Sequence, residues 1–493
     1  MKQFFVKNRI SLLFIFLFFF FYYYPIISLN LKYRDDYIRS LIMMFGFIQE
    51  GRIVSKIVLD FLSFTDGVLI APLTQILSVI CIACTIVYVA IALFKKINFF
   101  SFSIVSLIFL NPFYLQNMSF GYDSLPMTIS TCCAVISATF ILKTRYYALF
   151  SIVCALIILF SYQTTLGIYV NCLLFILCKH YLEHGFDNQS KIYTKATVCI
   201  GIYTLLCLLF TLIYPYIFSG FNTRFIISLS NIKANLLQTV FYIKILFLNI
   251  HYIIYIAAIT TILSLAAYHF KQYKNKKITV KNIVCSLVII PITYIAILLA
   301  AEGPSILLTF EIDNLRVLIG ISFLWVISFY FISLLSQRIY YGFYIVFSVF
   351  CFSTSYSYGV FLKDQDVSFQ ALMNNINYDI GHSSHSPELK IIALNPIPLA
   401  ASNKRLTTKI PFFLYLYGEQ DFDWLAAMKI SNVLPYYPAN NFTEICQSIY
   451  DIHSDKKLTI KTIKSDNYTL YFNKNNVLID FYTEKKNDYC KEK

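Results

Sequence analysis

Acidic and basic side chains gather just after the first long apolar run of the chain. Residues 32–37 read Lys-Tyr-Arg-Asp-Asp-Tyr, and Glu50 and Arg52 follow them. A carboxylate that takes a proton from a hydroxyl activates a weak nucleophile, so Asp35 and Asp36 are candidates for a general base. One Asp before a helix is commonly an N-cap. A single cap accounts for only one of the two carboxylates. A charged carboxylate close to the hydrocarbon of the membrane costs free energy, so such residues commonly have a function.

A second group of candidates lies in the loop 111–125, where Asp123 is the one acidic or basic side chain. Asp123 either orients substrate hydroxyls or caps the next apolar segment, whose Pro126 suits a first helical turn. Both interpretations stay open. Tyr122, Glu50 and Gln163 also lie at the ends of apolar runs, and we predict that they help to bind the substrate or the acceptor.

Three arginines have the right chemistry to bind a phosphate. The guanidinium fork matches phosphate oxygens, and Arg34, Arg52 and Arg316 all flank apolar runs. For Arg316 the alternative is that it extends to the membrane interface with no substrate to bind. The spacing of His382 and His385 suggests a metal site, but no further ligand is evident and a solvated loop is the better interpretation.

The composition indicates a membrane protein. Of the 493 residues, 58% are apolar and 13% are charged, whereas soluble domains have about half and about a quarter. The net charge of +14 comes mostly from basic clusters between apolar runs, as expected for cytoplasmic loops. Because no basic face with stacking aromatics is evident, the sequence does not predict a nucleic-acid-binding protein. The first run, 10–28, lacks a small-x-small cleavage site, so we predict an uncleaved helix with a cytoplasmic N-terminus.

About eleven transmembrane helices are expected from the lengths of the apolar runs. The odd number places the C-terminus outside. A further apolar stretch, 235–250, is predicted to be an interfacial helix, since counting it as a span would export the basic loop 271–281. The predicted spans are 10–28, 69–93, 98–114, 125–142, 146–161, 164–178, 197–218, 251–269, 283–301, 317–336 and 340–358.

The composition changes near residue 359, which divides the chain into a transmembrane module, 1–358, and a tail, 359–493. Within the module the first outward loop, 29–66, carries an amphipathic helix from Asp35 to about Ile48. Alternating runs at 458–463, 468–472 and 477–481 predict a meander of strands, and 421–434 predicts a helix. The tail is therefore expected to be a small extracytoplasmic α/β domain. Its cysteines, Cys446 and Cys490, form either a disulfide or two thiols.

Three features, taken in order, resemble the serotype-converting O-antigen glucosyltransferases, the type II Gtr proteins. They are the Tyr-Arg-Asp-Asp-Tyr stretch at 33–37, the loop with Asn-Pro-Phe-Tyr at 111–114 and Gly-Tyr-Asp-Ser-Leu-Pro at 121–126, and Ser-Tyr-Gln at 161–163. The plan of many spans followed by an outward tail is similar too. The resemblance covers the first half of the chain best.

This resemblance implies a GT-C-like fold in a bacterial inner membrane. A hexose, most simply glucose, would pass from undecaprenyl phosphate to a hydroxyl of the O-antigen of lipopolysaccharide on the periplasmic side. In such enzymes an acidic residue of the first outward loop serves as the base, a role that falls on Asp35 or Asp36. The resemblance requires no organic cofactor and leaves a divalent metal open. The alternatives are an O-antigen polymerase and a transporter of polysaccharide or lipid-linked sugar.

Overall fold

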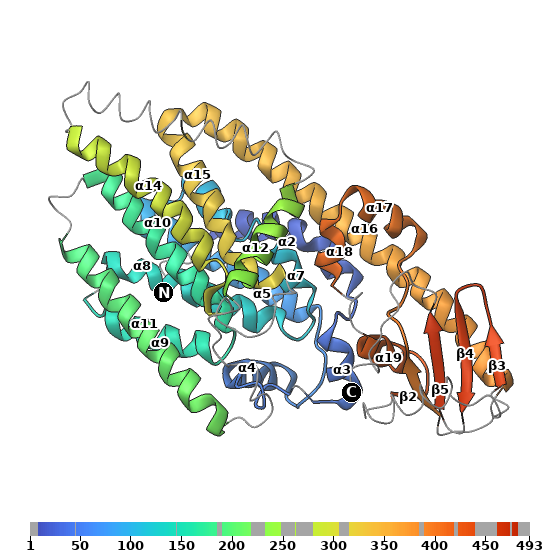
Figure 1. Ribbon diagram of the computed structural model, residues 1–493. Coiled ribbons are helices and arrows are strands. Elements are labelled where there is room, and N and C mark those ends of the chain that lie inside the picture. The colour runs from blue at the N-terminus through green and yellow to red at the C-terminus, as the bar shows by residue number, and fades with distance from the viewer. Residues whose placement is uncertain are drawn as a thin grey trace. The chain divides into compact units, whose positions relative to one another are not determined.

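A computed structural model describes residues 8–44, 46–143, 145–184, 190–217, 232–247, 262, 280–304, 315–383, 389–418, 423–438, 461–473 and 476–481. The chain forms two compact units. The helical unit comprises Met1–Asn30, Gly46–Thr65 and Ile70–Ser357, and the sheet unit comprises Leu31–Phe45, Asp66–Leu69 and Tyr358–Lys493. The long helices of the first and the strands of the second are drawn in Figure 1.

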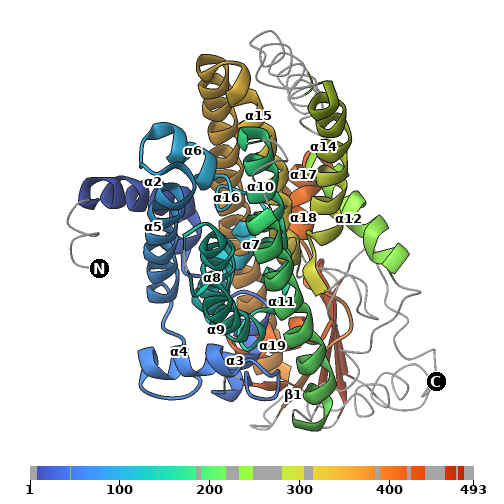
Figure 2. The ribbon, with the colours of Figure 1, turned by 90° about the vertical axis from the view of Figure 1, so that its left-hand side faces the viewer.

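The helical unit consists of long apolar helices and a few short ones. In the described part of the chain, seven helices are long and apolar enough to cross a membrane, which agrees with a polytopic helical membrane protein. Within the unit, α8 packs against α5, α9 and α10, and α10 packs against α14 (Figure 2). The elements are α2 (Arg9–Leu29), α4 (Ile53–Ser63), α5 (Leu73–Phe94), α6 (Phe99–Ser106), α7 (Tyr114–Ser119), α8 (Ser124–Lys143), α9 (Tyr147–Leu159), η1 (Gln163–Thr165), α10 (Leu166–His184), α11 (Ser190–Ile217), α12 (Ile232–Phe247), α14 (Val280–Ala300), η4 (Leu315–Ile321), α15 (Ser322–Leu335) and the first part of α16 (Gln337–Ser383).

One of the predicted spans is wrong. Residues 98–114 do not form a membrane-long helix, because α6 ends at Ser106 and a turn leads to the six-residue α7. Every residue from 101 to 128 is buried inside the helical unit. The run is therefore apolar because the rest of the protein encloses it. By its length alone, an apolar run of this kind can be either a short membrane span or a buried core segment.

One other helix is shorter than a typical span, while a further predicted run lies almost wholly outside the described residues. Helix α9 has 13 residues, about 20 Å at 1.5 Å per residue, whereas α14 has 21 residues. The expected span 251–269 lies outside the described residues except for residue 262. The stretch predicted to be interfacial is helical, as α12. The total of eleven spans stays a prediction.

The sheet unit contains a five-stranded mixed sheet in the order β2-β1-β5-β4-β3. The predicted meander is confirmed, since β3 (Lys461–Lys464), β4 (Tyr468–Asn473) and β5 (Asn476–Phe481) pair antiparallel in sequence order. Strand β1 (Lys390–Ala393) pairs parallel with β5 and with β2 (Tyr437–Pro438). The predicted helix at 421–434 is α19 (Asp423–Ser431). Helices α17 (Ala401–Lys409) and α18 (Phe412–Tyr417) also lie in the described part of the tail.

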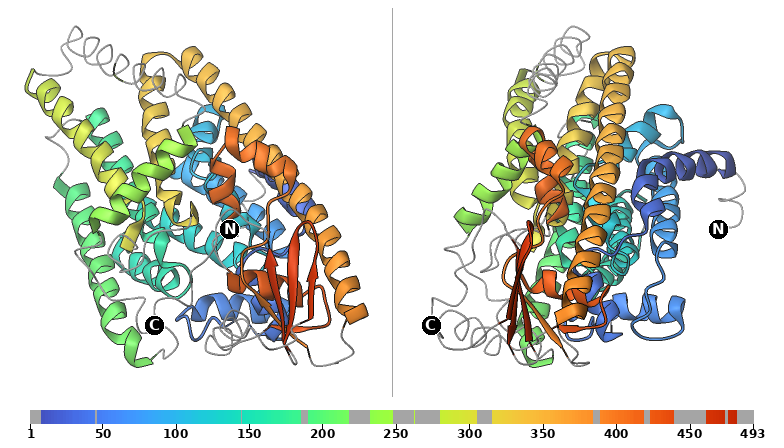
Figure 3. Two further views of the ribbon diagram at one scale, coloured as in Figure 1. Left: turned by 45° about the vertical axis from the view of Figure 1, so that its right-hand side comes forward. Right: turned by 90° about the vertical axis from the view of Figure 1, so that its right-hand side faces the viewer.

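Helix α16 continues from the last span into the sheet unit without a break, whereas the sequence predicted that the helix ends near residue 358. Its second half carries Phe369, Met373, Ile376 and Ile380 in helical spacing, and all four are buried in the core of the sheet unit. Side chains of α19 and of the strands share this core, so α16 lies along one face of the sheet (Figure 3).

The first-loop helix α3 (Asp35–Ile42) belongs to the sheet unit although it precedes the tail by more than 300 residues. Tyr33 Oη donates to the Leu416 carbonyl at 2.7 Å. Lys32 Nζ donates to Asn432 Oδ1 at 2.8 Å, and the Asn432 amide donates to the Tyr37 carbonyl at 2.8 Å. The helix ends at Ile42, before a left-handed Met43 with φ of 49°, so the predicted extension to Ile48 is wrong.

Candidate active site

The two carboxylates at the start of α3 have different surroundings. Asp36 is fully buried, and its Oδ2 accepts a hydrogen bond of 3.0 Å from the Tyr33 amide. Asp35 is partly exposed at the first helical position. Asp36 therefore holds the chain entering the helix, and Asp35 is the more exposed of the two carboxylates.

A buried lysine lies beneath α3 within the sheet unit. Lys429 of α19 is 4% exposed, and its ammonium lies over the rings of Tyr37, Phe369 and Tyr417, 5.1, 4.8 and 5.7 Å from their centroids. Aromatic faces attract a cation most strongly when it is desolvated. This cluster joins the first-loop helix to α16 and to the tail. Arg34, predicted to bind phosphate, belongs to the same unit and is buried too, with 7% exposure.

The turn before α4 places Arg52 inside the helical unit. Gly51 has φ of 67°, a left-handed conformation that suits glycine, and the Arg52 amide then donates to the Phe47 carbonyl at 2.7 Å. Arg52 Nη2 lies 2.8 Å from Asp123 Oδ1, and Nη1 lies 3.4 Å from Glu50 Oε2. The Asp123 side chain is fully buried. Arg52, Glu50 and Asp123 therefore form one ion-pair cluster.

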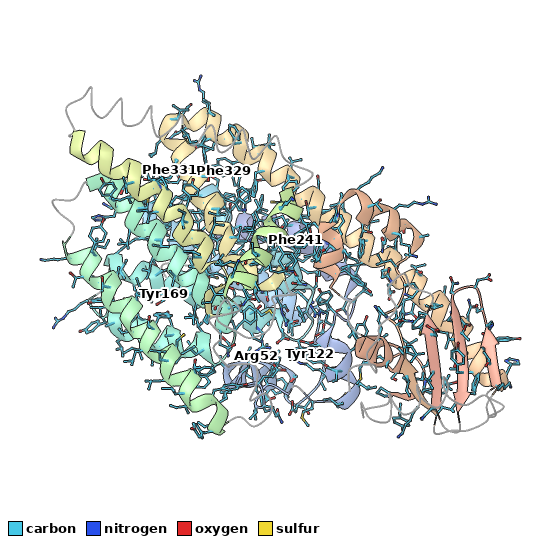
Figure 4. All side chains as sticks on the ribbon, viewed as in Figure 1. Arg52, Tyr122, Tyr169, Phe241, Phe329 and Phe331 are labelled. Carbon is cyan, nitrogen blue, oxygen red and sulfur yellow. The ribbon has the colours of Figure 1, made fainter. Side chains whose placement is uncertain are left out.

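Two aromatic rings and a carbonyl complete the surroundings of Arg52. Its guanidinium carbon lies 4.8 Å from the centroid of Phe47 and 5.9 Å from that of Tyr162. Arg52 Nε donates to the Ser161 carbonyl at 2.7 Å, which links the loop before α4 to the turn after α9. Figure 4 labels Arg52 and Tyr122, two members of this end of the helical unit.

Tyr162 connects Arg52 to the second arginine of the unit. Its hydroxyl donates to the Arg316 carbonyl at 3.3 Å. Burial raises the pKa of Tyr162, while the guanidinium groups of Arg316 and Arg52 oppose this shift. The Arg316 amide donates to Gln116 Oε1 at 2.6 Å, and its guanidinium carbon lies 4.5 Å from the Phe120 ring centroid. Unlike Arg52, Arg316 is only partly buried.

The structure thus brings together some of the predicted site residues and separates others. Asp123, Glu50, Arg52 and Arg316 lie in one connected cluster of the helical unit. Gln163 instead donates to the Leu159 carbonyl at 2.7 Å, at the end of α9. Tyr122 is buried, with 1% exposure. Both Cys446 and Cys490 lie outside the described residues, as does His385, while His382 ends α16 with its Nδ1 2.9 Å from the Tyr378 carbonyl.

The sequence interpretation missed Tyr162, Gln116 and Glu302. The first two stand inside the quoted motifs, as the middle residue of Ser-Tyr-Gln and as a neutral amide in the Asp123 loop. Glu302 directly follows the apolar run 283–301 and is 1% exposed. An acidic residue at the end of a span was the available signal. Among the residues that the structure describes, no group of three or more His, Cys, Asp or Glu side chains is arranged to hold a metal.

Comparison with known proteins identifies the family of the chain. Residues 24–327 match the family model described as glucosyl transferase GtrII. The chain is also 26% identical over 170 residues to an uncharacterized 55.3 kDa protein in the gtrB 5' region of Salmonella phage P22. That alignment covers 34% of this chain and 35% of the relative, so it spans about a third of either protein. No solved structure matches the chain. Because the family model covers more than half of the sequence, the chain belongs to the GtrII glucosyl transferase family.

Proposed function

We propose that the protein transfers glucose from a polyprenyl phosphate to a hydroxyl of a polysaccharide, on the outward face of a bacterial inner membrane. The observation that carries this proposal is the match to the glucosyl transferase family over residues 24–327. That range includes Asp35, Arg52, Asp123 and Arg316. The expected donor is undecaprenyl phosphate-glucose, and the expected acceptor is the O-antigen of lipopolysaccharide.

In the proposed reaction the acceptor hydroxyl oxygen forms a bond to the anomeric carbon of glucose. The bond between that carbon and the phosphate oxygen breaks, and the polyprenyl phosphate leaves with the electron pair. The hydroxyl proton passes to Asp35. We assign this role to Asp35 because it is partly exposed, whereas Asp36 is buried and accepts the Tyr33 amide. A positioned carboxylate base contributes about 10²–10⁴-fold to such a step.

The leaving phosphate gains negative charge and needs a cation more than it needs an acid. Arg316 fits this role better than Arg52. Arg52 is buried, with 8% exposure, whereas Arg316 is partly exposed beside Phe120. A guanidinium placed where charge develops stabilises the transition state. In this proposal Arg52 and Asp123 keep Tyr162 and Arg316 in place.

The test uses full-length protein purified in detergent, undecaprenyl phosphate carrying radiolabelled glucose, and lipopolysaccharide as acceptor. We expect label to enter the polysaccharide, and we expect the Asp35→Asn variant to lose at least a hundredfold in rate. The matched control is Asp60→Asn, which changes a carboxylate that is paired with Lys56 on α4.

Two results would contradict the proposal at different points. If no hexose is transferred from a panel of polyprenyl phosphate hexoses, the proposed function is wrong. If Asp35→Asn transfers glucose at the wild-type rate, the proposed function stands, but another carboxylate must serve as the base.

A further inference from the structure

The turn after α14 is held tightly between two other segments of the helical unit. A Cβ at Gly167, in the first turn of α10, would lie 2.2 Å from the Ala300 carbonyl oxygen and 2.7 Å from the Gly303 amide. A Cβ at Gly320, in η4, would lie 2.6 Å from the Ala301 carbonyl oxygen. Both segments therefore approach the turn 300–303 as closely as backbone allows, and this fixes the position of Glu302.

Glu302 is a buried carboxyl group without a partner among the residues that the structure describes. Its side chain is 1% exposed, and neither carboxylate oxygen accepts a hydrogen bond. The sequence of residues 305–314, which follows the turn, contains no Lys, Arg or His. A buried charge without a counter-charge costs several kcal/mol, and such groups change protonation instead.

Burial raises the pKa of Glu302 from its ordinary value of 4.5 to about 8, so it carries a proton at neutral pH. The elements packed against the turn carry titratable groups that include Tyr162 before η1, Tyr169 and Cys172 in α10, Tyr294 in α14 and Arg316 in η4. The shift in the Glu302 pKa arises from desolvation. A protonated carboxyl is a neutral group that both donates and accepts a hydrogen bond.

A second polar group at the same junction also has an unused oxygen. Asn171 lies one helical turn after Gly167 and is fully buried. Its Nδ2 donates to the Ile297 carbonyl at 3.1 Å and to the Gly320 carbonyl at 3.0 Å, which sets the orientation of the amide. Its Oδ1 has no hydrogen-bond partner within the described ranges. Buried polar atoms are nearly always bonded, so each exception needs an explanation.

We propose that Glu302 and Asn171 bind the hydroxyl groups of the hexose that the donor lipid carries, an inference that rests on the function proposed above. The two groups offer a donor and several acceptors without net charge, which suits a neutral polyol. They do not suit a phosphate, which binds cations and N–H groups. Glu302 thus recognises the sugar, while Arg316 contacts the lipid phosphate.

The experiment compares two ligands on full-length protein in detergent: undecaprenyl phosphate-glucose and undecaprenyl phosphate without sugar. Binding of each is measured by titration calorimetry for the wild type, Glu302→Gln and Glu302→Leu. Leucine keeps most of the volume and removes both oxygens, a change that folded proteins tolerate when the polar group is unpartnered. Glu183→Gln is the control, because Glu183 is exposed and pairs with Lys179.

We expect Glu302→Leu to weaken binding of the sugar-bearing lipid by about tenfold or more, the effect of losing hydrogen bonds to buried groups. Binding of the bare polyprenyl phosphate should stay unchanged. Glu302→Gln, which still donates and accepts, should bind the sugar-bearing lipid within about threefold of wild type, as should Glu183→Gln.

The failures are distinguishable. If the wild type binds the sugar-bearing lipid and Glu302→Leu binds it equally well, the sugar site is wrong and the function stands. An equal loss for both lipids would also overturn the sugar site, since it would indicate a general disturbance of donor binding. A wild type that binds neither lipid would overturn the proposed function and this site with it.

Discussion

Arg52 and Asp123 form a buried ion pair, with Nη2 and Oδ1 2.8 Å apart, between two turns that are 71 positions apart in the sequence. The Asp123 side chain is fully enclosed, and that of Arg52 is 10% exposed. Such a pair adds little net stability when both partners are present, yet removing one partner leaves a buried charge uncompensated. The pair thus determines whether the turns before α4 and α8 stay in place.

Asp123→Asn should destabilise the helical unit by about 3–5 kcal/mol, the cost of breaking a buried pair. Thermal unfolding of the detergent-solubilised protein measures this effect. The double variant Arg52→Met with Asp123→Leu should recover much of the loss, because it removes both charges. The control Asp60→Asn breaks an (i, i+4) pair with Lys56 and should change stability by less than about 0.5 kcal/mol. A melting temperature of Asp123→Asn equal to that of the wild type would contradict the structural role of the pair.

Substitution of the two adjacent carboxylates of α3 should have different effects, with Asp36 needed for stability and Asp35 needed for activity. Asp36→Asn weakens the acceptor of the buried Tyr33 amide and should cost about 1–3 kcal/mol of stability. Asp35→Asn should unfold like the wild type and fail in sugar transfer. Measuring melting temperature and transfer rate on the same preparations checks both. The reverse pattern, with a stable, inactive Asp36→Asn, would exchange the two roles.

Gly167→Ala should disrupt the junction that places Glu302. The added Cβ would lie 2.2 Å from the Ala300 carbonyl oxygen, far inside van der Waals contact, so backbone must move. We expect a lower melting temperature and at least tenfold weaker binding of the sugar-bearing lipid. Gly201→Ala is the matched control, because a Cβ at Gly201 meets no atom within 4 Å and alanine stabilises a helix by about 0.5–1 kcal/mol relative to glycine. Equal behaviour of the two variants would contradict the tight packing.

Lys429→Met should loosen α3 from the rest of the sheet unit. Methionine keeps an apolar stem but loses the cation between the rings of Tyr37, Phe369 and Tyr417, contacts worth about 0.5–2 kcal/mol each. Hydrogen exchange of the amides 36–42 should become faster. The exposed Lys404→Met on α17 serves as the control. Unchanged exchange in Lys429→Met would show that the hydrogen bonds of Tyr33 and Asn432 hold the helix without the lysine.

Stability should depend on pH through Glu302. Its pKa is raised in the folded protein from 4.5 to about 8, so the native state binds a proton that the unfolded chain releases. This contribution is fully present below about pH 4.5, declines as the pH rises, and is lost above about pH 8. The wild-type melting temperature should therefore fall between pH 5 and pH 8 relative to that of Glu302→Gln, whose amide does not titrate. Parallel curves for the two proteins would contradict the raised pKa.

Local sequence patterns predicted much of the sheet unit. The alternating runs predicted β4 and β5, and the helical pattern predicted α19. Such patterns can be recognised from neighbouring residues, because burial repeats every 2 residues in a strand and every 3.6 residues in a helix. The same rule was available for Phe369, Met373, Ile376 and Ile380, which mark the continuation of α16. The change in composition near residue 359 concealed that helix, since polar residues on its other faces suggest a loop.

The sequence by itself determined the membrane character, the acidic first loop and the family motifs, since these depend on composition and short-range order. Only the tertiary structure decided that residues 98–114 are enclosed and do not form a membrane-long helix, because an apolar run does not specify whether lipid or protein surrounds it. It also gave Asp36 and Asp35 different surroundings and paired Arg52 with Asp123. Among the described residues it left the buried Glu302 without a hydrogen-bond partner. Each of these depends on contacts between distant segments, and burial and hydrogen bonding of a side chain are set by neighbours that the local sequence does not contain.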